Sequence, residues 1–572
     1  MASSIPTPAN LFQGLSKRWH IAAPLTGDQL SPLGELPSLI AELLHRRGVR
    51  TASEATAFLE VSDSLLEDPN TLPGIAPAVE RLQSARDRGE TVAVYGDFDS
   101  DGVTGTALMV RALGRFGIAS VPYIPHRVQE GHGLNAPAIN LLHSQGVSLI
   151  VTVDCGVNDV EAVALASELG METIITDHHT IGGPLPGAVA IINPKALDST
   201  YPFYDLTGVG MALKLAHALL EPGLPDTWAE GLLELAAIGT VTDMAPLLHE
   251  NRYIVRRGVE QLRHTTTPGL LELMRAARLE PLLLEAEGIG FGIGPRLNAA
   301  GRLDHAMAAY DLLMTTDSAH AKALTAQLET HNNQRRELTD EVLRRCRAQV
   351  LEAEDIGPLI MVGSPDYNPG VVGLVAGKLT EELGVPTAVY SVDRNVVRAS
   401  CRSAPSFHWA EALEACEPLL TRYGGHAQAA GFTCDAAVLP ELQERLAAIA
   451  SEQLDGQPRT TDGFVDAALP LQHLMGPIFT ACRSLAPFGV GNPAPVFLTR
   501  GLEVESVRTM GADKAHFRMR LRSNAAVWEA VAFRQSFVAG TKRVDVVYTL
   551  DIDHWGGTSK LRLTVLDYAP AA

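Results

Sequence analysis

The sequence predicts a multidomain protein: a doubly wound α/β domain, a long connecting helix, a smaller α/β domain and a C-terminal β-barrel. Short apolar strands alternate with amphipathic helices between residues 92 and 192, which is typical of a parallel sheet covered by helices. Helical periodicity then runs through 318–354, and closely spaced short apolar segments fill the last hundred residues. At 572 residues the chain is too long for one hydrophobic core, so separate domains are expected.

In the first domain, apolar segments mark the strands and amphipathic segments the helices. The segment 92–96 (VAVYG) shows no alternation of polar residues, as expected for a strand that is buried on both faces. The same reasoning predicts strands at 92–96, 119–124, 148–153, 172–176 and 189–192, with helices at 103–116, 134–144 and 158–169 between them.

Acidic and imidazole side chains follow three of these strands, at Asp97, Asp99 and Asp101, at Asp154, and at Asp177-His178-His179. The carboxyl edge of an open parallel sheet is where ligands bind. Carboxylates crowded there repel one another unless a cation lies between them, and hard divalent cations prefer oxygen ligands. The sequence therefore predicts a metal site at this edge.

Other interpretations of these residues are less favourable. An EF-hand loop that began at Asp97 would need a glutamate at its twelfth position, where this chain has Leu108. The segment 99–103 resembles the DxDx[TV] motif of haloacid-dehalogenase-like phosphatases, but those have no use for an Asp-His-His sequence. A solvated acidic turn and a buried structural pair of histidines are the neutral alternatives. Three such strand ends together favour a common site.

Composition indicates a globular protein with an uneven charge distribution. The net charge is −20, but residues 461–572 hold 12 Lys and Arg against 10 Asp and Glu, which leaves −22 for residues 1–460. Net charge alone therefore does not exclude a nucleic-acid ligand. Six scattered cysteines, the lack of a leader-like N-terminus and the lack of an apolar run that could cross a bilayer predict a cytoplasmic protein with no membrane contact.

The motifs GDFDSDG, VDCGV (153–157) and Asp-His-His resemble motifs I to III of the DHH phosphoesterases. A fourth motif is expected as an aspartate after a helix, and Asp243 follows the apolar helical segment 229–240. The resemblance implies two Mn²⁺ or Mg²⁺ ions, held by Asp99, Asp101, Asp154, His178 and Asp243, with His179 close by. Many family members have a histidine where this chain has Tyr95, and Asp97 is expected to substitute for it as a ligand.

Two further motifs are similar to those of one subgroup, the RecJ single-stranded-DNA-specific exonucleases. They are PxRxxEGxGL at 125–134 and GPRLNAAGRL at 294–303, and GGHxxAAG at 424–431 resembles the DHHA1 domain signature. The planar fork of arginine matches phosphate oxygens, although a surface salt bridge is the neutral alternative for each arginine. The resemblance implies DNA or phosphate contacts for Arg127, Arg296, Asn298, Arg302, Ser400, Arg402 and His426. This chain departs from the subgroup at 367–370, where it has Tyr-Asn-Pro-Gly and the subgroup often has Trp-His-x-Gly.

The apolar segments near the C-terminus predict a small all-β barrel, and the resemblance implies that it is an OB-fold, a fold suited to tracking single-stranded DNA. Arg518, Arg520 and Arg522 alternate along one strand and so share a face, with the aromatics Phe517, Trp528, Phe533 and Tyr548 nearby, most of them expected in the core. The predicted boundaries are 1–40 for an N-terminal extension, 41–317 for the DHH domain, 318–354 for the connecting helix, 355–455 for the DHHA1 domain and 460–572 for the OB-fold.

The resulting hypothesis is a metal-dependent 5′→3′ exonuclease that hydrolyses single-stranded DNA in recombination and repair, by two-metal catalysis. The resemblance further implies a monomer that works with a helicase and a single-strand-binding protein. Two alternatives stay open. One is another DHH hydrolase acting on pyrophosphate, short oligonucleotides or cyclic dinucleotides, and the other is a non-catalytic DNA-binding scaffold on a DHH fold.

Overall fold

A computed structural model of the protein describes residues 11–571 apart from 198, 221–230, 353–355, 405–406, 455–461, 475, 512–513, 525 and 554–559. The chain divides into two compact units. One comprises Met1–Glu67, Met244–Arg256 and Thr461–Ala572, and the other comprises Asp68–Asp243 and Arg257–Thr460. The second unit contains both α/β sheets, and the first contains the barrel. The residue-level domain boundaries given above stay predictions.

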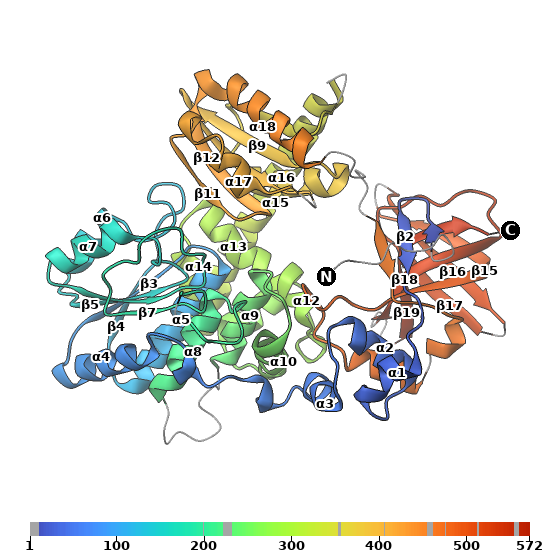
Figure 1. Ribbon diagram of the computed structural model, residues 1–572, viewed down its shortest axis with the longest axis horizontal. Helices are drawn as coiled ribbons and strands as arrows, with labels where there is room; N and C mark the ends of the chain where they lie inside the picture. The colour runs from blue at the N-terminus through green and yellow to red at the C-terminus, as the bar shows by residue number, and fades with distance from the viewer. Residues whose placement is uncertain are drawn as a thin grey trace. The chain divides into compact units, whose positions relative to one another are not determined.

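The first sheet of the second unit is entirely parallel, in the order β4-β3-β5-β6-β7. Its strands are β3 (Val92–Gly96), β4 (Ser120–Tyr123), β5 (Leu149–Val153), β6 (Glu172–Thr176) and β7 (Ala190–Ile192), which confirms the five predicted strands. Helices α6 (Ala136–Ser144) and α7 (Val160–Glu168) cover one face, and α4 (Ile75–Arg88), α5 (Ser100–Phe116) and α8 (Gly208–Leu220) cover the other (Figure 1). The sheet is therefore doubly wound, as predicted.

The order of the strands in the sheet determines where a ligand can bind. Both faces of β3 and β5 are covered, because every residue of the two strands is buried. The chain runs outward from β3 to β4 and then returns to β5 on the other side of β3, so the order reverses between β3 and β5. Ligands bind beyond the carboxyl ends of the strands at such a switch point. Asp97 directly follows β3 there, and Asp154 directly follows β5.

A helical layer continues the second unit beyond this sheet. It consists of α9 (Leu233–Thr242), α10 (His249–Arg263, which begins in the first unit), α11 (Pro268–Ala276), α12 (Ala286–Gly288), the π-helical turn η6 (Ile289–Ile293), α13 (Gly294–Leu303) and α14 (Met307–Met314). The connecting helix α15 spans Ser318–Glu352 and packs against α11, α13 and α14 and against α16 of the next sheet. It therefore contacts both halves of the second unit.

The second sheet is mixed, in the order β11-β12-β10-β9-β8. Its strands are β8 (Ile360–Ser364), β9 (Thr387–Asp393), β10 (Val396–Arg402), β11 (Arg422–Gly425) and β12 (Ala429–Asp435), and its helices are α16 (Val372–Leu383), α17 (Trp409–Glu414) and α18 (Leu439–Gln453). Only β8 and β9 pair in parallel. This confirms a second, smaller α/β domain.

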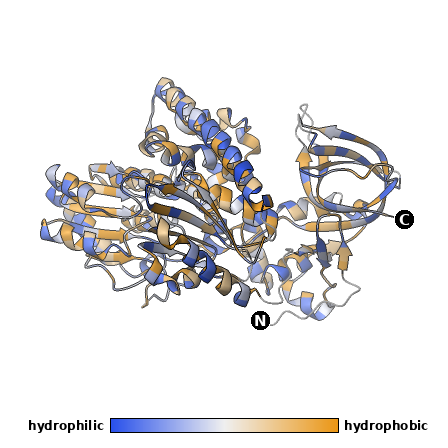
Figure 2. Ribbon diagram, turned by 90° about the horizontal axis from the view of Figure 1, so that it is seen from above, coloured by the Kyte–Doolittle hydropathy of each residue, from blue (hydrophilic) through white to orange (hydrophobic). Residues whose placement is uncertain are grey.

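The first unit contains a closed five-stranded barrel. Strands β15 (Val496–Met510), β16 (His516–Ser523), β17 (Ala526–Ala532), β19 (Lys560–Pro570) and β18 (Arg543–Asp553) pair in that order, and β18 pairs with β15 to close the barrel. Two of the short apolar segments of this region, 495–498 and 502–507, belong to the one strand β15, which has a bulge between Thr499 and Leu502. Both hydropathy colours occur along the barrel strands in Figure 2, as expected when one face of each strand fills the core.

The N-terminal segment is part of this unit. Strands β1 (Leu11–Gln13) and β2 (Arg18–Ile21) form a sheet with β13 (Gly463–Val465), within a stretch that the sequence suggested only as an extension. The buried carboxylate of Asp567 on β19 accepts hydrogen bonds from Trp19 Nε1 at 2.9 Å and from the backbone N–H of Lys17 at 3.1 Å. Helices α2 (Ser38–Arg46) and α3 (Ala52–Glu60) add Leu43, Leu44 and Phe58 to the barrel core.

Within the described part of the chain, no helix combines the length and the apolar character needed to cross a membrane.

Arg252 tests how the first unit is held together. Its guanidinium is fully buried, donates to the carbonyls of Phe58, Leu485, Ser484 and Ala486, and lies 3.8 Å over the Phe58 ring. Arg252→Met leaves these carbonyls unpaired, so we expect the free energy of unfolding of this unit to fall by at least about 3 kcal/mol in urea titrations. Arg257→Met, at a more exposed position of the same helix and just outside this unit, is the control and should cost under about 1 kcal/mol. Equal losses for the two variants would contradict this role.

Candidate metal centre

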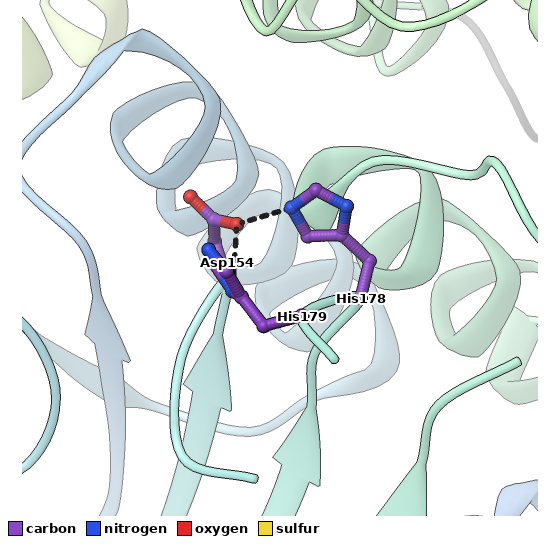
Figure 3. A group of neighbouring side chains, drawn as sticks. All are labelled: Asp154, His178 and His179. Carbon is purple, nitrogen blue, oxygen red and sulfur yellow. Dashed lines mark ion pairs between the residues drawn. The ribbon is translucent and has the colours of Figure 1, made fainter. Parts of the chain in front are cut away.

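Four elements bring acidic and imidazole side chains together at the switch point. They are the turns after β3, β5 and β6 and the C-terminal end of α9. Three groups of side chains each have ligand atoms within 4.8 Å of one another: Asp97 with Asp99 and Asp154; Asp101 with His178 and Asp243; and Asp154 with His178 and His179. Figure 3 shows the last group, in which the imidazole of His178 points at Asp154. Asp154 and His178 each belong to two groups, so the groups form one continuous site.

Helix N-termini hold two of the carboxylates. Asp99 is the N-cap of α5, where its Oδ1 accepts hydrogen bonds from the backbone N–H groups of Asp101 and Gly102. The two oxygens of Asp101 accept from Gly208 N at 2.6 Å and from Val209 N at 2.9 Å, at the start of α8. Backbone N–H groups at helix N-termini favour negative charge, so these contacts keep both carboxylates in place.

Asp154 adopts an uncommon backbone conformation. Its φ is +64°, in the left-handed region that aspartate tolerates better than most residues. A Cβ added to Gly208 would lie 2.3 Å from the Asp154 Cβ, so only glycine allows α8 to approach this closely. Such strain is kept where the surroundings enforce it, typically at functional sites. Here it places the Asp154 carboxylate between the two histidines and the other acids.

Asp177 orients the histidine pair. Its Oδ1 accepts hydrogen bonds from His179 Nδ1 at 2.8 Å and from the backbone N–H of His178 at 2.7 Å, and its Oδ2 accepts from Val157 N. Burial raises the pKa of Asp177, but the hydrogen bond and charge of His179 bring it below its ordinary value. A carboxylate on one imidazole nitrogen fixes the ring and leaves the other nitrogen for a ligand. The sequence showed Asp177 in the motif but gave no sign of this role.

The electrostatics of the cluster favour a cation. Burial and then repulsion from Asp97 raise the pKa of Asp99. Burial and repulsion from Asp99 raise the pKa of Asp101 to about 7, and desolvation with repulsion from Asp101 and Asp99 raises that of Asp243 to about 9. Burial also lowers the pKa of His178, which keeps its imidazole neutral and able to bind a metal.

Two buried oxygens show that the residues fit a metal. Oδ1 of Asp97 and Oδ1 of Asp154 accept no hydrogen bond within the described part of the chain. Imidazole nitrogens do lie near them, His132 Nδ1 at 3.2 Å and His178 Nε2 at 3.0 Å, but without hydrogen-bond geometry. Oxygen and nitrogen atoms that lie within 4.8 Å of one another and are not used up in hydrogen bonds are available as metal ligands. Carboxylates suit Mg²⁺ or Mn²⁺, and the imidazole favours Mn²⁺.

Tyr95 braces the loop that follows β4 from a position where many DHH proteins have a metal ligand. Its hydroxyl donates to the carbonyl of Gly133 at 2.9 Å and accepts from Asn135 Nδ2 at 3.0 Å. That loop carries Arg127 and His132 toward the acidic cluster. The structure thus places Tyr95 behind the site, and His132 beside Asp97 is a neighbour that the sequence did not single out.

Arginines gather on one side of the acids. Arg127 lies 4.1 Å over the Phe98 ring, and Arg302 donates to the carbonyl of Gly370 at 3.1 Å. The Nε atoms of both are buried and donate to no group in the described residues. Burial, followed by the charges of Arg127 and Arg335, lowers the pKa of Arg302 to about 9. Like charges that are buried together with free donors require an anion.

The second sheet contributes the remaining predicted phosphate contacts. Ser400 and Arg402 lie on β10, and a Cβ added to Gly373 would meet Ser400 Oγ at 3.3 Å and an Arg402 nitrogen at 3.4 Å. The ring of His426 stacks near the ring of His179, with 6.2 Å between the centroids. The structure therefore brings His426 to the metal cluster and Arg402 near Arg302, whose pKa its charge helps to lower.

Arg296 and Asn298 make contacts within the fold. Arg296 donates to Glu329 on α15 at 2.6 Å and to the carbonyls of Gly292 and Ala276. Oδ1 of Asn298 accepts from the backbone N–H of Ser100 at 3.0 Å. These bonds hold α13 against α15 and α5, so DNA contacts of the two side chains stay predictions that the structure does not favour.

On the barrel, the basic face is partly neutralised. Arg518, Arg520 and Arg522 lie on the outward face of β16, while Phe517, Met519 and Leu521 are buried. Arg520 lies 3.6 Å from both Glu505 and Glu529, and Arg522 also pairs with Glu505. Of the four aromatics, Phe517, Trp528 and Tyr548 belong to the core and only Phe533 is half exposed. A DNA-binding role for Arg518 and Arg520 stays a prediction.

Comparison with known proteins identifies the family. Family models match at 91–240 (DHH family, N-terminal domain), 356–452 (DHHA1 domain) and 465–567 (RecJ OB domain). The single-stranded-DNA-specific exonuclease RecJ of Bacillus subtilis is 37% identical over 96% of this chain and 71% of its own, and that of Salmonella typhimurium is 32% identical over 94% and 96%. The chain belongs to the RecJ family.

A solved structure agrees with this assignment. The crystal structure of RecJ in complex with Mn²⁺ from Thermus thermophilus superposes with a TM-score of 0.82 at 31% identity, and the match covers 97% of this chain and 80% of that one. A second structure of the same protein, in complex with Mg²⁺, gives a TM-score of 0.77. The predicted DHH, DHHA1 and OB-fold domains are confirmed.

Neutralising one acid should separate metal binding from folding. In chelator, Asp154→Asn removes repulsion within the cluster, so we expect its melting temperature to exceed that of the wild type by about 2–4 °C for each kcal/mol of repulsion removed. Added Mn²⁺ should raise the melting temperature of the wild type more than that of the variant. Hydrolysis by the variant should fall by more than about 100-fold. Equal Mn²⁺-induced shifts in the two proteins would contradict a metal role for Asp154.

Proposed function

We propose that this RecJ-family single-stranded-DNA-specific exonuclease hydrolyses phosphodiesters from the 5′ end, with two Mn²⁺ or Mg²⁺ ions, in DNA recombination and repair. The main support is the continuous cluster of acids and imidazoles beside two buried arginines whose Nε atoms donate to no group in the described chain. The acids suit divalent cations and the arginines suit phosphate, so both partners of a phosphodiesterase reaction have matching groups.

The proposed ligands divide into two sets that share Asp154. Asp97, Asp99 and Asp154 would hold one ion, and Asp101, His178 and Asp243, with Asp154, would hold the other. Bound ions of this kind lower the pKa of a water and stabilise the charge on the attacking and leaving oxygens. Asp177 keeps His179 oriented, and the α5 and α8 N-termini keep Asp99 and Asp101 in place.

The arginines would position the strand. Arg127 and Arg302 both act electrostatically on Asp99, so a phosphate that they bind lies next to the first set of ligands. Ser400, Arg402 and His426 would contact the strand from the second sheet. Free Nε–H groups of Arg127 and Arg302 supply donors that no protein group of the described chain uses. Fixing the phosphate in this way lowers the entropy cost of the reaction.

The two alternatives have less support. A hydrolase of pyrophosphate or dinucleotides needs no barrel domain, whereas the RecJ OB domain model matches this chain. A non-catalytic scaffold needs no intact ligand set, whereas each motif contributes a side chain to the cluster. We further propose, from the resemblance alone, a cytoplasmic monomer that works with a helicase and a single-strand-binding protein.

Digestion of end-labelled DNA tests the function. With Mn²⁺, we expect a 5′-labelled single strand to release labelled mononucleotide from the start, while a 3′-labelled strand shortens progressively. Chelator should abolish both reactions, and blunt duplex of the same sequence should be resistant. Faster turnover of dinucleotides than of the long strand would favour the small-substrate alternative, and an inert wild type would favour the scaffold.

Arg302 and Arg296 form a matched pair that tests the phosphate site. Arg302→Gln removes a charge-assisted donor that forms no ion pair within the described residues, so KM for a 5′-phosphorylated strand should rise about tenfold or more while a 5′-hydroxyl strand is less affected. Arg296→Gln breaks its bonds to Glu329 and should lower thermal stability with little change in the preference for a 5′-phosphate. Steady-state kinetics and melting curves check both. A loss of that preference in Arg296→Gln alone would reverse the two assignments.

A further inference from the structure

A fourth strand of the sheet delivers polar groups that the motifs do not include. Strand β7 pairs with β6 at the edge of the sheet and is followed by Asn193, Pro194 and Lys195. Asn193 Nδ2 donates to the carbonyl of His179 at 3.0 Å, and Lys195 Nζ donates to the carbonyl of His178 at 2.5 Å. Asn193 Oδ1 in turn accepts from Lys195 N at 2.8 Å. This segment therefore packs against the back of the histidine turn.

The ammonium of Lys195 lies among the charged groups of the site. The side chain is half-buried, and among the described residues no carboxylate forms an ion pair with it. Its charge nevertheless acts on three groups: it opposes the rise in the pKa of Asp243, and it adds to the lowering of the pKa of His178 and of His426. Nζ is thus close to the second set of metal ligands and to the second sheet.

Bracing the turn does not require a charge. The neutral amide of Asn193 supports the next carbonyl along the same turn with an ordinary hydrogen bond. An ammonium has three N–H donors, and the His178 carbonyl takes one of them. Nζ makes no other hydrogen bond within the described chain. A half-buried cation with free donors beside a centre for a polyanion is suited to a phosphate oxygen.

We infer that Lys195 is a further phosphate-binding residue of the catalytic centre, whose two remaining N–H groups donate to the bound strand on the Asp243 side. This inference rests on the proposed function. Arg127 and Arg302 act on Asp99, in one set of ligands, whereas Lys195 acts on Asp243, in the other set. The strand is then held by cations near both sets of ligands.

The salt dependence of binding separates a phosphate contact from a brace. Each phosphate contact to a single strand contributes about 0.7 to the slope of log K against log salt concentration. We would measure binding of a 5′-phosphorylated single-stranded oligonucleotide by fluorescence anisotropy in chelator, and kcat/KM with Mn²⁺, both across a KCl series. Lys195→Met should reduce the slope by about 0.7 and raise KM about tenfold or more. Lys195→Arg should keep the slope.

Controls make the outcomes distinct. Lys322→Met removes the same charge from an exposed position on α15 and should leave slope and KM unchanged. Melting curves show whether Lys195→Met is folded. If it is not, Lys195→Gln takes its place: a salt slope reduced by about 0.7 supports the phosphate contact, and an unchanged slope overturns it. An unchanged slope with lower kcat would overturn the phosphate contact and leave only the brace. If the wild type neither binds nor cleaves the strand, the proposed function fails. If the wild type binds and cleaves it, and Lys195→Met has the same salt slope and KM, only this inference fails.

Discussion

Repulsion among carboxylates that are crowded at one sheet edge is the constraint on which the rest of the second unit depends. Two unit charges 4.8 Å apart repel by about 3 kcal/mol at an effective dielectric constant of 20. A few such pairs would offset the net stability of a typical domain, which is about 5–15 kcal/mol. The fold compensates with backbone N–H groups at two helix starts and with the hydrogen bond and charge of histidines such as His179, and divalent cations supply the remainder.

The positions of these ligands could be predicted because they follow from strand ends. Uniformly apolar segments gave the strands, and parallel pairing brings their ends to one edge, so Asp99, Asp154 and His178 were expected together. What could not be predicted depends on hydrogen bonds between distant residues. Neither the bond from Tyr95 to Gly133 nor that from Lys195 to the His178 carbonyl leaves a periodic signal in the sequence.

The same limit applies to the arginines and to the N-terminal segment. A motif identifies an arginine but does not show whether its nitrogens are already occupied: Arg296 Nε donates to Glu329, whereas Arg302 Nε donates to no group in the described chain. Residues 11–21 look weakly structured because their strands are short, and their stability comes from pairing with β13 and from Asp567 near the other end of the chain. Partners that lie far away in the sequence determine whether such a segment is ordered, and local composition does not reveal them.

The contrast between two buried arginines shows how the fold separates structure from function. In Arg252 every guanidinium nitrogen donates to a backbone carbonyl, so the group is satisfied and its role is to join segments of the first unit. In Arg302 the Nε has no acceptor among the described residues, and other arginines lie nearby. An unused donor on a buried cation is suited to a ligand that completes it. An acidic enzyme can therefore act on a polyanion. Its negative charge at the site is concentrated where divalent cations bind, and the phosphates are expected to contact the nearby positive side chains of Arg127, Arg302 and Lys195.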